Sequence, residues 1–227
     1  AAVEIIGDIE LFARAMDRTP GTVRPKVIAI TGTNGKSTTT ALIGWVLKSA
    51  GLTVHVGGNI GVGVLALPEP TPDAVYVIEV SSYQLDLTTT FAPDVAILTN
   101  ISPDHLDRHG GMEGYVAAKR RVLLNQGKGD TAVIGVDDPW CQRICTEITA
   151  ANRRTIRPIS AGKAMGRGVY ALQGVLYDAT GERVTETAGQ RAGERFQLGG
   201  ESVAVGRDEM VRHEIEALEP RLGSQGA

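Results

Sequence analysis

The sequence predicts an α/β domain with a mainly parallel sheet and helices on both of its faces. From Lys26 onward, short apolar runs rich in β-branched residues alternate with longer stretches of helical character, which is typical of βαβ units. Most of these runs are largely apolar, as in strands of a parallel sheet that is buried on both faces. The 28 glycines and 10 prolines among 227 residues supply the many tight turns that such a fold needs.

Each element follows from its local pattern. An apolar helical pattern predicts a helix over Ile5–Met16, and Thr19, Pro20, Gly21 and Pro25 mark a linker behind it. The predicted strands are Lys26–Thr31, Thr53–Val56, Val75–Val80, Val95–Asn100, Thr131–Val136 and Thr155–Ser160. The predicted helices between them are Lys36–Ala50, Gly61–Leu67, Gln84–Thr90, Met112–Leu124 and Asp138–Ala150.

The pattern changes after Ser160. Short alternating runs at residues 169–172, 175–177, 196–198 and 202–205 predict small antiparallel hairpins toward the C-terminus. Val211, Ile215, Leu218 and Leu222 then form one helical stripe before a polar tail. We therefore divide the chain into a lead-in helix and linker (1–24), a main domain (25–206) and a terminal helix with tail (207–227).

Composition excludes several classes of protein. Because 23 basic residues face 26 acidic ones, for a net charge of −3, no overall basic field attracts nucleic acid or an anionic membrane. The first residues do not resemble a signal peptide, and no apolar run is long enough to cross a bilayer, so we expect a cytoplasmic protein. The two cysteines, Cys141 and Cys145, are spaced for one helix face and not for a disulfide framework, which indicates a reducing compartment.

The clearest local signal is a phosphate-binding loop. The sequence Thr31-Gly32-Thr33-Asn34-Gly35-Lys36-Ser37-Thr38 follows a buried strand and opens a helix. The backbone N–H groups of such a loop bind phosphates, Lys36 adds a point charge, and Ser37 can ligate Mg²⁺. The usual pattern has a further glycine where Ile30 stands, and the alternative is a surface turn, but the strand and helix on either side favour phosphate binding.

Two further polar segments follow predicted strands. Asn59 lies in Gly57-Gly58-Asn59-Ile60-Gly61, where ligands of open α/β sheets bind, although a plain turn explains it equally well. Glu79 stands inside an apolar strand just before Ser81 and Ser82. A buried carboxylate needs a cation or hydrogen-bond donors, which favours a magnesium ligand over a structural helix cap.

The last two polar features lie farther along the chain. The segment from Asn100 to His109 follows a strand and includes two aspartates, His105 and an arginine, a density that indicates polar chemistry in preference to a solvated loop. Lys119 follows Tyr115 by four residues on a predicted helix with alanines beside it. Lys119 thus either lies on a packed helix face or is an ordinary solvated lysine.

Five segments together resemble the Mur ligase superfamily. They are Thr-Gly-Thr-Asn-Gly-Lys-Ser-Thr, Gly-Gly-Asn-Ile-Gly, Glu-Val-Ser-Ser-Tyr-Gln-Leu, Asn-Ile-Ser-Pro-Asp-His-Leu-Asp and Tyr-Val-Ala-Ala-Lys, in this order. Within the superfamily, the lead-in Glu4–Phe12 and the Ser-Ser-Tyr-Gln-Leu run are most similar to the ligases that add D-glutamate. The resemblance covers residues 3 to 160 and implies the P-loop-containing central ATPase domain of those enzymes.

The resemblance implies a role for each motif residue. ATP phosphates would be bound by Gly32, Thr33, Asn34, Gly35, Lys36, Ser37 and Thr38. Ser37 and Glu79 would ligate magnesium, His105 would ligate a second Mg²⁺, and Lys119 would be carbamylated and help to hold that metal. Lys36, His105 and Lys119 would be the catalytic residues. Asn59, Ser81 and Ser82 would line the substrate site.

The implied reaction is an ATP-driven amide ligation in peptidoglycan synthesis, and so in cell-wall growth and division. The substrate UDP-N-acetylmuramoyl-L-alanine would form an acyl phosphate, and the amine of D-glutamate would displace the phosphate. Family members also carry an N-terminal and a C-terminal domain that this chain has no room for, so we expect it not to complete ligation alone. The family's Gly-x-His-Asn turn would fall at residues 206–209, where its histidine and asparagine are absent.

Two alternatives remain open. The related folylpolyglutamate synthases share the phosphate loop and the amide chemistry, but Gly-Gly-Asn-Ile-Gly and Ser-Ser-Tyr-Gln-Leu argue against them. A non-catalytic nucleotide-binding module that regulates or scaffolds cell-wall enzymes is favoured by the missing domains. The residues Lys36, Glu79, His105 and Lys119 do not distinguish this module from an enzyme.

Overall fold

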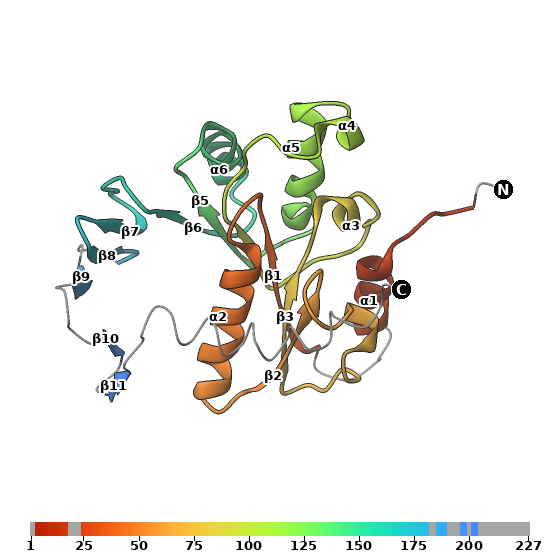
Figure 1. The fold of residues 1–227 in the computed structure, drawn as a ribbon, viewed down its shortest axis with the longest axis horizontal. Helices are drawn as coiled ribbons and strands as arrows, with labels where there is room; N and C mark the ends of the chain where they lie inside the picture. The colour runs from red at the N-terminus through yellow and green to blue at the C-terminus, as the bar shows by residue number, and fades with distance from the viewer. Residues whose placement is uncertain (1–2, 18–23, 182–184, 190–195, 199–200, 204–227) are drawn as a thin grey trace, which may run out of the picture.

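The centre of the molecule is a large twisted sheet (Figure 1). The structure is a computed structural model that describes residues 3–17, 24–181, 185–189, 196–198 and 201–203. Within these ranges, nine strands form one sheet in the order β2-β3-β1-β4-β5-β6-β7-β8-β9, and β10 pairs with β11. The strands are β1 (Lys26–Thr31), β2 (Thr53–Gly58), β3 (Ala74–Glu79), β4 (Val95–Leu98), β5 (Thr131–Gly135), β6 (Thr155–Ser160), β7 (Gly168–Leu172), β8 (Val175–Ala179), β9 (Thr185–Gly189), β10 (Phe196–Leu198) and β11 (Glu201–Val203).

The sheet is parallel from β2 to β7, and β8 and β9 continue it in antiparallel pairing. This confirms the predicted mainly parallel sheet with antiparallel strands after Ser160. Strand β1 lies between β3 and β4, with Ile30 opposite Glu79 and Thr31 opposite Leu98. The chain therefore leaves β1 toward one side of the sheet and later returns to its other side. In open α/β sheets, ligands bind at the carboxyl ends of the strands at such a reversal.

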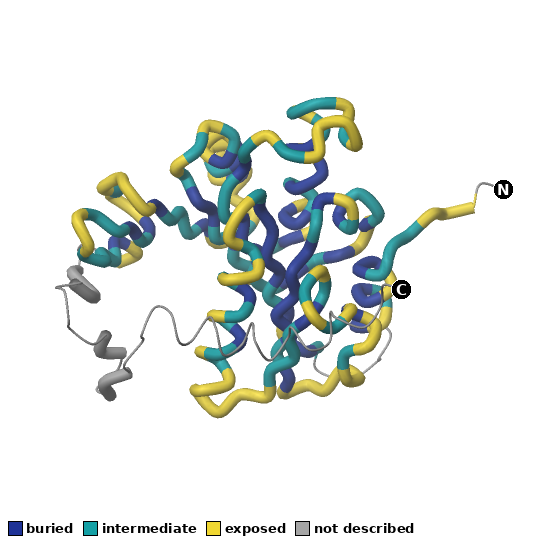
Figure 2. The backbone as a smooth tube through the Cα atoms, in the orientation of Figure 1, coloured by how far each residue is buried: buried dark blue, intermediate teal, exposed yellow. Residues whose placement is uncertain are grey.

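Helices cover both faces of the sheet, as predicted. They are α1 (Asp8–Asp17), α2 (Lys36–Ser49), α3 (Ser82–Asp86), α4 (Leu106–His109), α5 (Met112–Arg120) and α6 (Pro139–Ala151), with 3₁₀ turns at Val64–Ala66 and Arg121–Leu123. Residues from α2 pack with Ile30 and Val77 on one face, whereas residues from α1, α3, α5 and α6 pack on the other face with the alternate strand positions, such as Ala29 and Ile78. Figure 2 shows the buried residues concentrated in the central strands.

Several predicted elements differ from the structure. The helix expected at Gln84–Thr90 begins at Ser82, and only a 3₁₀ turn forms where a helix was expected at Gly61–Leu67. Gly57 and Gly58 belong to β2 and not to the turn behind it. Gly58 has φ 102°, and a side chain there would collide with the carbonyl group of Glu79, which explains the glycine. Helix α4 and strand β9 were not predicted.

Other expectations concern the ends of elements and of the chain. Cys141 and Cys145 are both free and lie on α6, which confirms that they share one helix. The expected helix over residues 211–222 and the turn at 206–209 lie outside the described residues, and the domain boundaries stay predictions. No helix in the described ranges has the length and apolar character needed to span a membrane.

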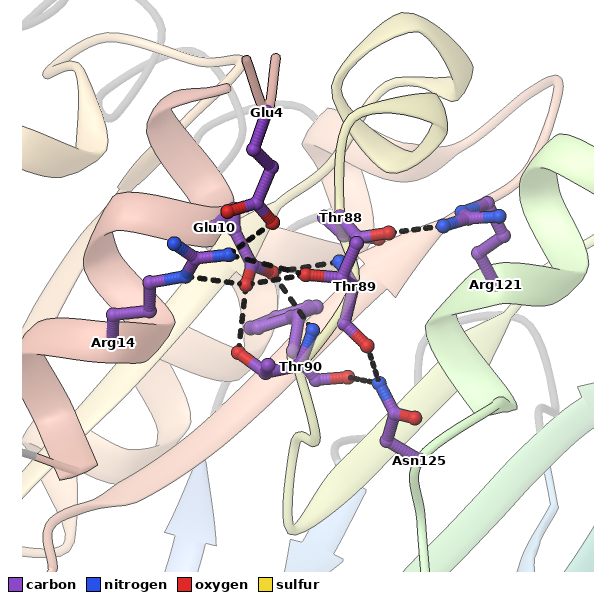
Figure 3. Close-up of polar contacts among 9 residues, drawn as sticks. Glu4, Glu10, Arg14, Thr88, Thr89, Thr90, Arg121 and Asn125 are labelled. Carbon is purple, nitrogen blue, oxygen red and sulfur yellow. Dashed lines mark hydrogen bonds and ion pairs between the residues drawn. The ribbon is translucent and has the colours of Figure 1, made fainter. Parts of the chain in front are cut away.

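The buried carboxylate of Glu10 joins helix α1 to the rest of the domain through hydrogen bonds (Figure 3). The Glu10 carboxylate accepts hydrogen bonds from the backbone N–H groups of Thr89 and Thr90, from both threonine hydroxyls and from Arg14 Nε, at 2.7–2.9 Å. Burial by itself would raise the pKa of Glu10, but these donors outweigh it and lower the pKa to about 2. Glu4 completes the network from the exposed side of Arg14.

We expect Glu10→Gln to destabilise the fold by about 2–3 kcal/mol at pH 7, because charge-assisted hydrogen bonds are lost and one amide group is left facing donors. The folded pKa of Glu10 lies below the ordinary value of 4.5, so its contribution to stability is present above about pH 4.5 and is lost as the pH falls toward 2. Urea unfolding of the variant and the unaltered chain should therefore converge at low pH.

The control for this prediction is Glu4→Gln. Glu4 is half exposed and pairs with Arg14 at the surface, so its loss should cost less than about 0.5 kcal/mol. A loss of stability for Glu10→Gln that is the same at pH 7 and pH 3 would contradict the proposed role of its charge.

Candidate functional site

The loop between β1 and α2 has the backbone that phosphate binding needs. Gly35 is the N-cap of α2, has φ 80°, and receives no side-chain capping hydrogen bond. A helix N-terminus without a cap presents its first N–H groups and a partial positive charge to an anion. Gly32 has φ 146°, and a side chain there would collide with Thr99. Ser37 and Thr38 are exposed at the start of the helix.

The segment that follows β4 holds this loop in shape. The backbone N–H of Thr33 donates to the carbonyl group of Asn100 at 2.9 Å, and that of Asn34 donates to Asn100 Oδ1 at 2.9 Å. Thr99 Oγ1 and Asn100 Nδ2 in turn donate to the Asn34 carbonyl group at 2.8 and 3.0 Å. The Asn34 backbone N–H and carbonyl are thus already bonded within the protein, so Asn34 shapes the loop.

A cavity of about 450 Å³ opens beside the loop. It is lined by Asp8, Lys36, Asn59, Ser81, Ser82, Tyr83, Gln84, Asp104, His105, Tyr115 and Lys119. Six of the predicted site residues, from Lys36 to Lys119, are therefore brought to one place by the fold. Asp8, Tyr83, Gln84 and Asp104 were given no role from the sequence, although all four lie in the segments that carried the resemblance.

The two lysines of the cavity are in different settings. Lys36 Nζ donates to the carbonyl group of Thr33 in its own loop at 2.9 Å. Lys119 is 2% exposed, donates to the carbonyl group of Gly32 at 2.6 Å and lies 4.7 Å from the centroid of the Tyr115 ring. Burial, together with the nearby Lys36 charge, lowers the pKa of Lys119 to about 8. Lys119 is thus on a packed helix face and is not solvated.

Glu79 is a buried carboxylate with only one of its two oxygens hydrogen-bonded. Its side chain is buried, and Oε1 accepts a hydrogen bond from Asn59 Nδ2 at 3.0 Å. Glu79 Oε2 is buried without any hydrogen-bond partner. Because an unpaired buried carboxylate oxygen is costly, a hard cation such as Mg²⁺ fits this position.

His105 is another residue that lines the cavity. Its side chain is about half exposed, its Nε2 is 3.4 Å from Asp104 Oδ2, and its ring centroid is 5.1 Å from that of Tyr83. Within the described part of the chain, no group of three or more His, Cys, Asp or Glu side chains forms a ready metal cage. A magnesium ion here would need other oxygen ligands, such as Ser37, phosphates or water, which is usual for this ion.

Comparison with known proteins agrees with this geometry. Residues 30–204 match the family model of the Mur ligase middle domain. The chain is 74% identical over 188 residues to the UDP-N-acetylmuramoylalanine–D-glutamate ligase of Caulobacter sp. strain K31, covering 83% of this chain and 40% of that protein. It is 47% identical over 190 residues to the ligase of the same name from Brucella abortus, covering 83% of this chain and 39% of that one. The chain thus spans about two fifths of these relatives.

Solved structures share the fold. A UDP-N-acetylmuramoyl-L-alanyl-D-glutamate–2,6-diaminopimelate ligase superposes with a TM-score of 0.58 at 23% identity, over 79% of this chain and 42% of that chain. MurF ligase from Thermotoga maritima, solved in complex with ADP, superposes with a TM-score of 0.53 at 19% identity, over 83% and 46% of the two chains.

Proposed function

The chain belongs to the Mur ligase family through its middle domain, and on this premise we propose that it binds Mg·ATP for a ligase that joins D-glutamate to UDP-N-acetylmuramoyl-L-alanine. The observation that carries the proposal is the cavity in which Lys36 of the phosphate loop and the buried Lys119 lie together. The chain spans two fifths of the length of its relatives. We therefore assign the binding sites for D-glutamate and for the uridine nucleotide to further ligase domains, which would be the partners of this one. We place the reaction in the cytoplasm, with no nucleic acid involved.

The residues present fit a bound nucleotide and metal. The loop from Gly32 to Thr38 would bind the phosphates, with Asn34 keeping the loop in shape and Lys36 opposite the β- and γ-phosphates. Ser37 and Glu79 would ligate one Mg²⁺, and His105 with a carbamylated Lys119 would hold a second. When bound, the metals supply positive charge that offsets the charge of the transferring phosphoryl group.

The proposed reaction has two steps. A carboxylate oxygen of the alanyl end bonds to the γ-phosphorus of ATP as ADP leaves, and the amine of D-glutamate then bonds to the acyl carbon as phosphate and a proton leave. Asn59, Ser81 and Ser82, which line the cavity, would contact the alanyl end.

The proposed role of Lys119 can be measured directly. Carbamate formation requires a neutral amine, which bonds to CO₂ and releases a proton. With a pKa of about 8 in place of 10.5, half of the Lys119 amines are neutral at pH 8, where exposed lysines are almost all protonated. With ¹³C-bicarbonate at pH 8 we expect a carbamate NMR signal that increases with Mg·ATP and is absent from Lys119→Arg.

The matched control is Lys128→Arg, because Lys128 is an exposed lysine whose replacement should leave the signal intact. A signal that survives in Lys119→Arg contradicts the assignment. Mg·ATP binding by calorimetry with no carbamate at any pH would instead support the non-catalytic nucleotide-binding module.

A further inference from the structure

Three side chains beside the cavity form a hydrogen-bonded chain. The Ser82 hydroxyl group lies 3.0 Å from His109 Nε2, and His109 Nδ1 lies 3.1 Å from Asp86 Oδ2. Ser82 and Asp86 are the first and last residues of α3, and His109 is the last residue of α4. Ser82 lines the cavity, whereas His109 and Asp86 are not among its lining residues.

The ring of His109 is held in a fixed orientation. Its side chain is 2% exposed, and its ring centroid lies 5.6 Å from that of Tyr83 and 5.5 Å from that of Tyr115. The Tyr115 hydroxyl group is 3.1 Å from Thr33 Oγ1 in the phosphate loop. A ring packed between two aromatic side chains keeps each nitrogen facing its partner.

The order of these partners determines which way each proton points. An ionised carboxylate accepts hydrogen bonds only, so Asp86 requires the proton of His109 on Nδ1. In the neutral ring, Nε2 is then an acceptor, and the Ser82 hydroxyl group donates to it. Ser82 Oγ can then accept a hydrogen bond from a ligand in the cavity, but it has no proton left to donate to one.

The neighbouring Ser81 is held by a different set of contacts. Its hydroxyl group accepts from the backbone N–H of Gln84 at 3.2 Å and lies 3.1 Å from Gln84 Oε1, to which it donates, in the capping box of α3. The proton of the Ser81 hydroxyl and one of its two lone pairs are thus used within α3. Of the two serines in the cavity wall, Ser82 is the one whose hydroxyl is oriented by a histidine.

We propose that Asp86 and His109 are positioning residues that hold Ser82 as a hydrogen-bond acceptor, and that Ser82 recognises the amide N–H of an N-acyl amino acid. The inference rests on the proposed function, since the acyl end of that substrate carries one amide N–H next to its reacting carboxylate. Ser82 thereby selects an N-acyl amino acid over the corresponding ester, which has no proton at this position.

The first test measures the proton on His109 in the chain without nucleotide. The sequence has four histidines, so ¹⁵N-histidine NMR is readily assigned with His109→Gln. We expect a neutral ring protonated on Nδ1, a loss of that preference in Asp86→Asn, and a shift of Nε2 in Ser82→Ala. His55→Gln is the control and should leave the His109 signals unchanged. A ring protonated on Nε2, or on both nitrogens, overturns the proposal.

The second test measures how much the amide N–H contributes to binding. NMR titrations give the affinities of N-acetyl-L-alanine and of O-acetyl-L-lactate, in which an ester oxygen replaces the amide N–H. We expect the amide to bind the Mg·ATP-loaded chain about fivefold more tightly, the size of one neutral hydrogen bond. Ser82→Ala should bring the ratio close to one, and Ser82→Thr should restore it. Equal affinities, or no binding of either compound, overturn the assignment of Ser82. Failure of the proposed function appears separately, as absence of Mg·ATP binding.

Discussion

Replacing Lys36 by alanine is expected to weaken Mg·ATP binding at least about a hundredfold while the fold remains intact. The Lys36 ammonium group donates to the Thr33 carbonyl group of its own loop and belongs to neither core cluster. Its removal therefore takes a positive charge from the phosphates without opening a cavity in the core. Calorimetry measures the binding, and thermal unfolding measures the stability.

The matched control is Lys48→Ala, which removes an exposed lysine from the last turn of the same helix, α2. Its affinity for Mg·ATP should stay within about twofold of that of the unaltered chain. If Lys36→Ala binds Mg·ATP as tightly as Lys48→Ala does, the loop is not the phosphate site.

Glu79→Gln is expected to have opposite effects on the free and the loaded chain. In the free chain it replaces a buried carboxylate whose Oε2 has no partner by a neutral amide that keeps the hydrogen bond from Asn59, so thermal stability should be unchanged or higher. With Mg·ATP present, the gain in stability that Mg²⁺ adds should be largely lost, because the metal loses an anionic ligand. Unfolding with and without Mg²⁺ measures both effects.

A double variant tests whether Glu79 and His105 act on the same bound species. Each single variant should weaken Mg²⁺-dependent nucleotide binding, and Glu79→Gln combined with His105→Ala should lose less than the sum of the two. Losses that simply add would show two independent sites. A Glu79→Gln chain that is destabilised equally with and without Mg²⁺ would show a purely structural carboxylate.

Local sequence patterns predicted the inner elements of the fold well. Strands β1 and β6 have the predicted bounds, because each holds several β-branched residues between turn residues. Helix α3 was misplaced because its start is set by the capping box of Ser81 and Gln84. Its end is followed by threonines whose N–H groups donate to Glu10, a partner about 80 residues away.

The sequence by itself determined the residues on which the proposed chemistry rests: a glycine-containing loop between a strand and a helix, and polar residues just after the strands that would end beside it. Motifs carry such information because each is a short run with a local backbone shape. The motifs do not predict the order of the strands in the sheet, and they therefore do not predict which motifs lie next to one another.

Only the tertiary structure determined which motifs lie side by side, because the strand order β3-β1-β4 results from packing between distant segments. It brought the Lys119 amine to the Gly32 carbonyl group, 87 residues away in sequence, and buried it there. It also left Glu79 Oε2 without a partner and placed His109 against Ser82. The environment of a charge or a proton depends on everything packed around it, and that environment exists only in the folded chain.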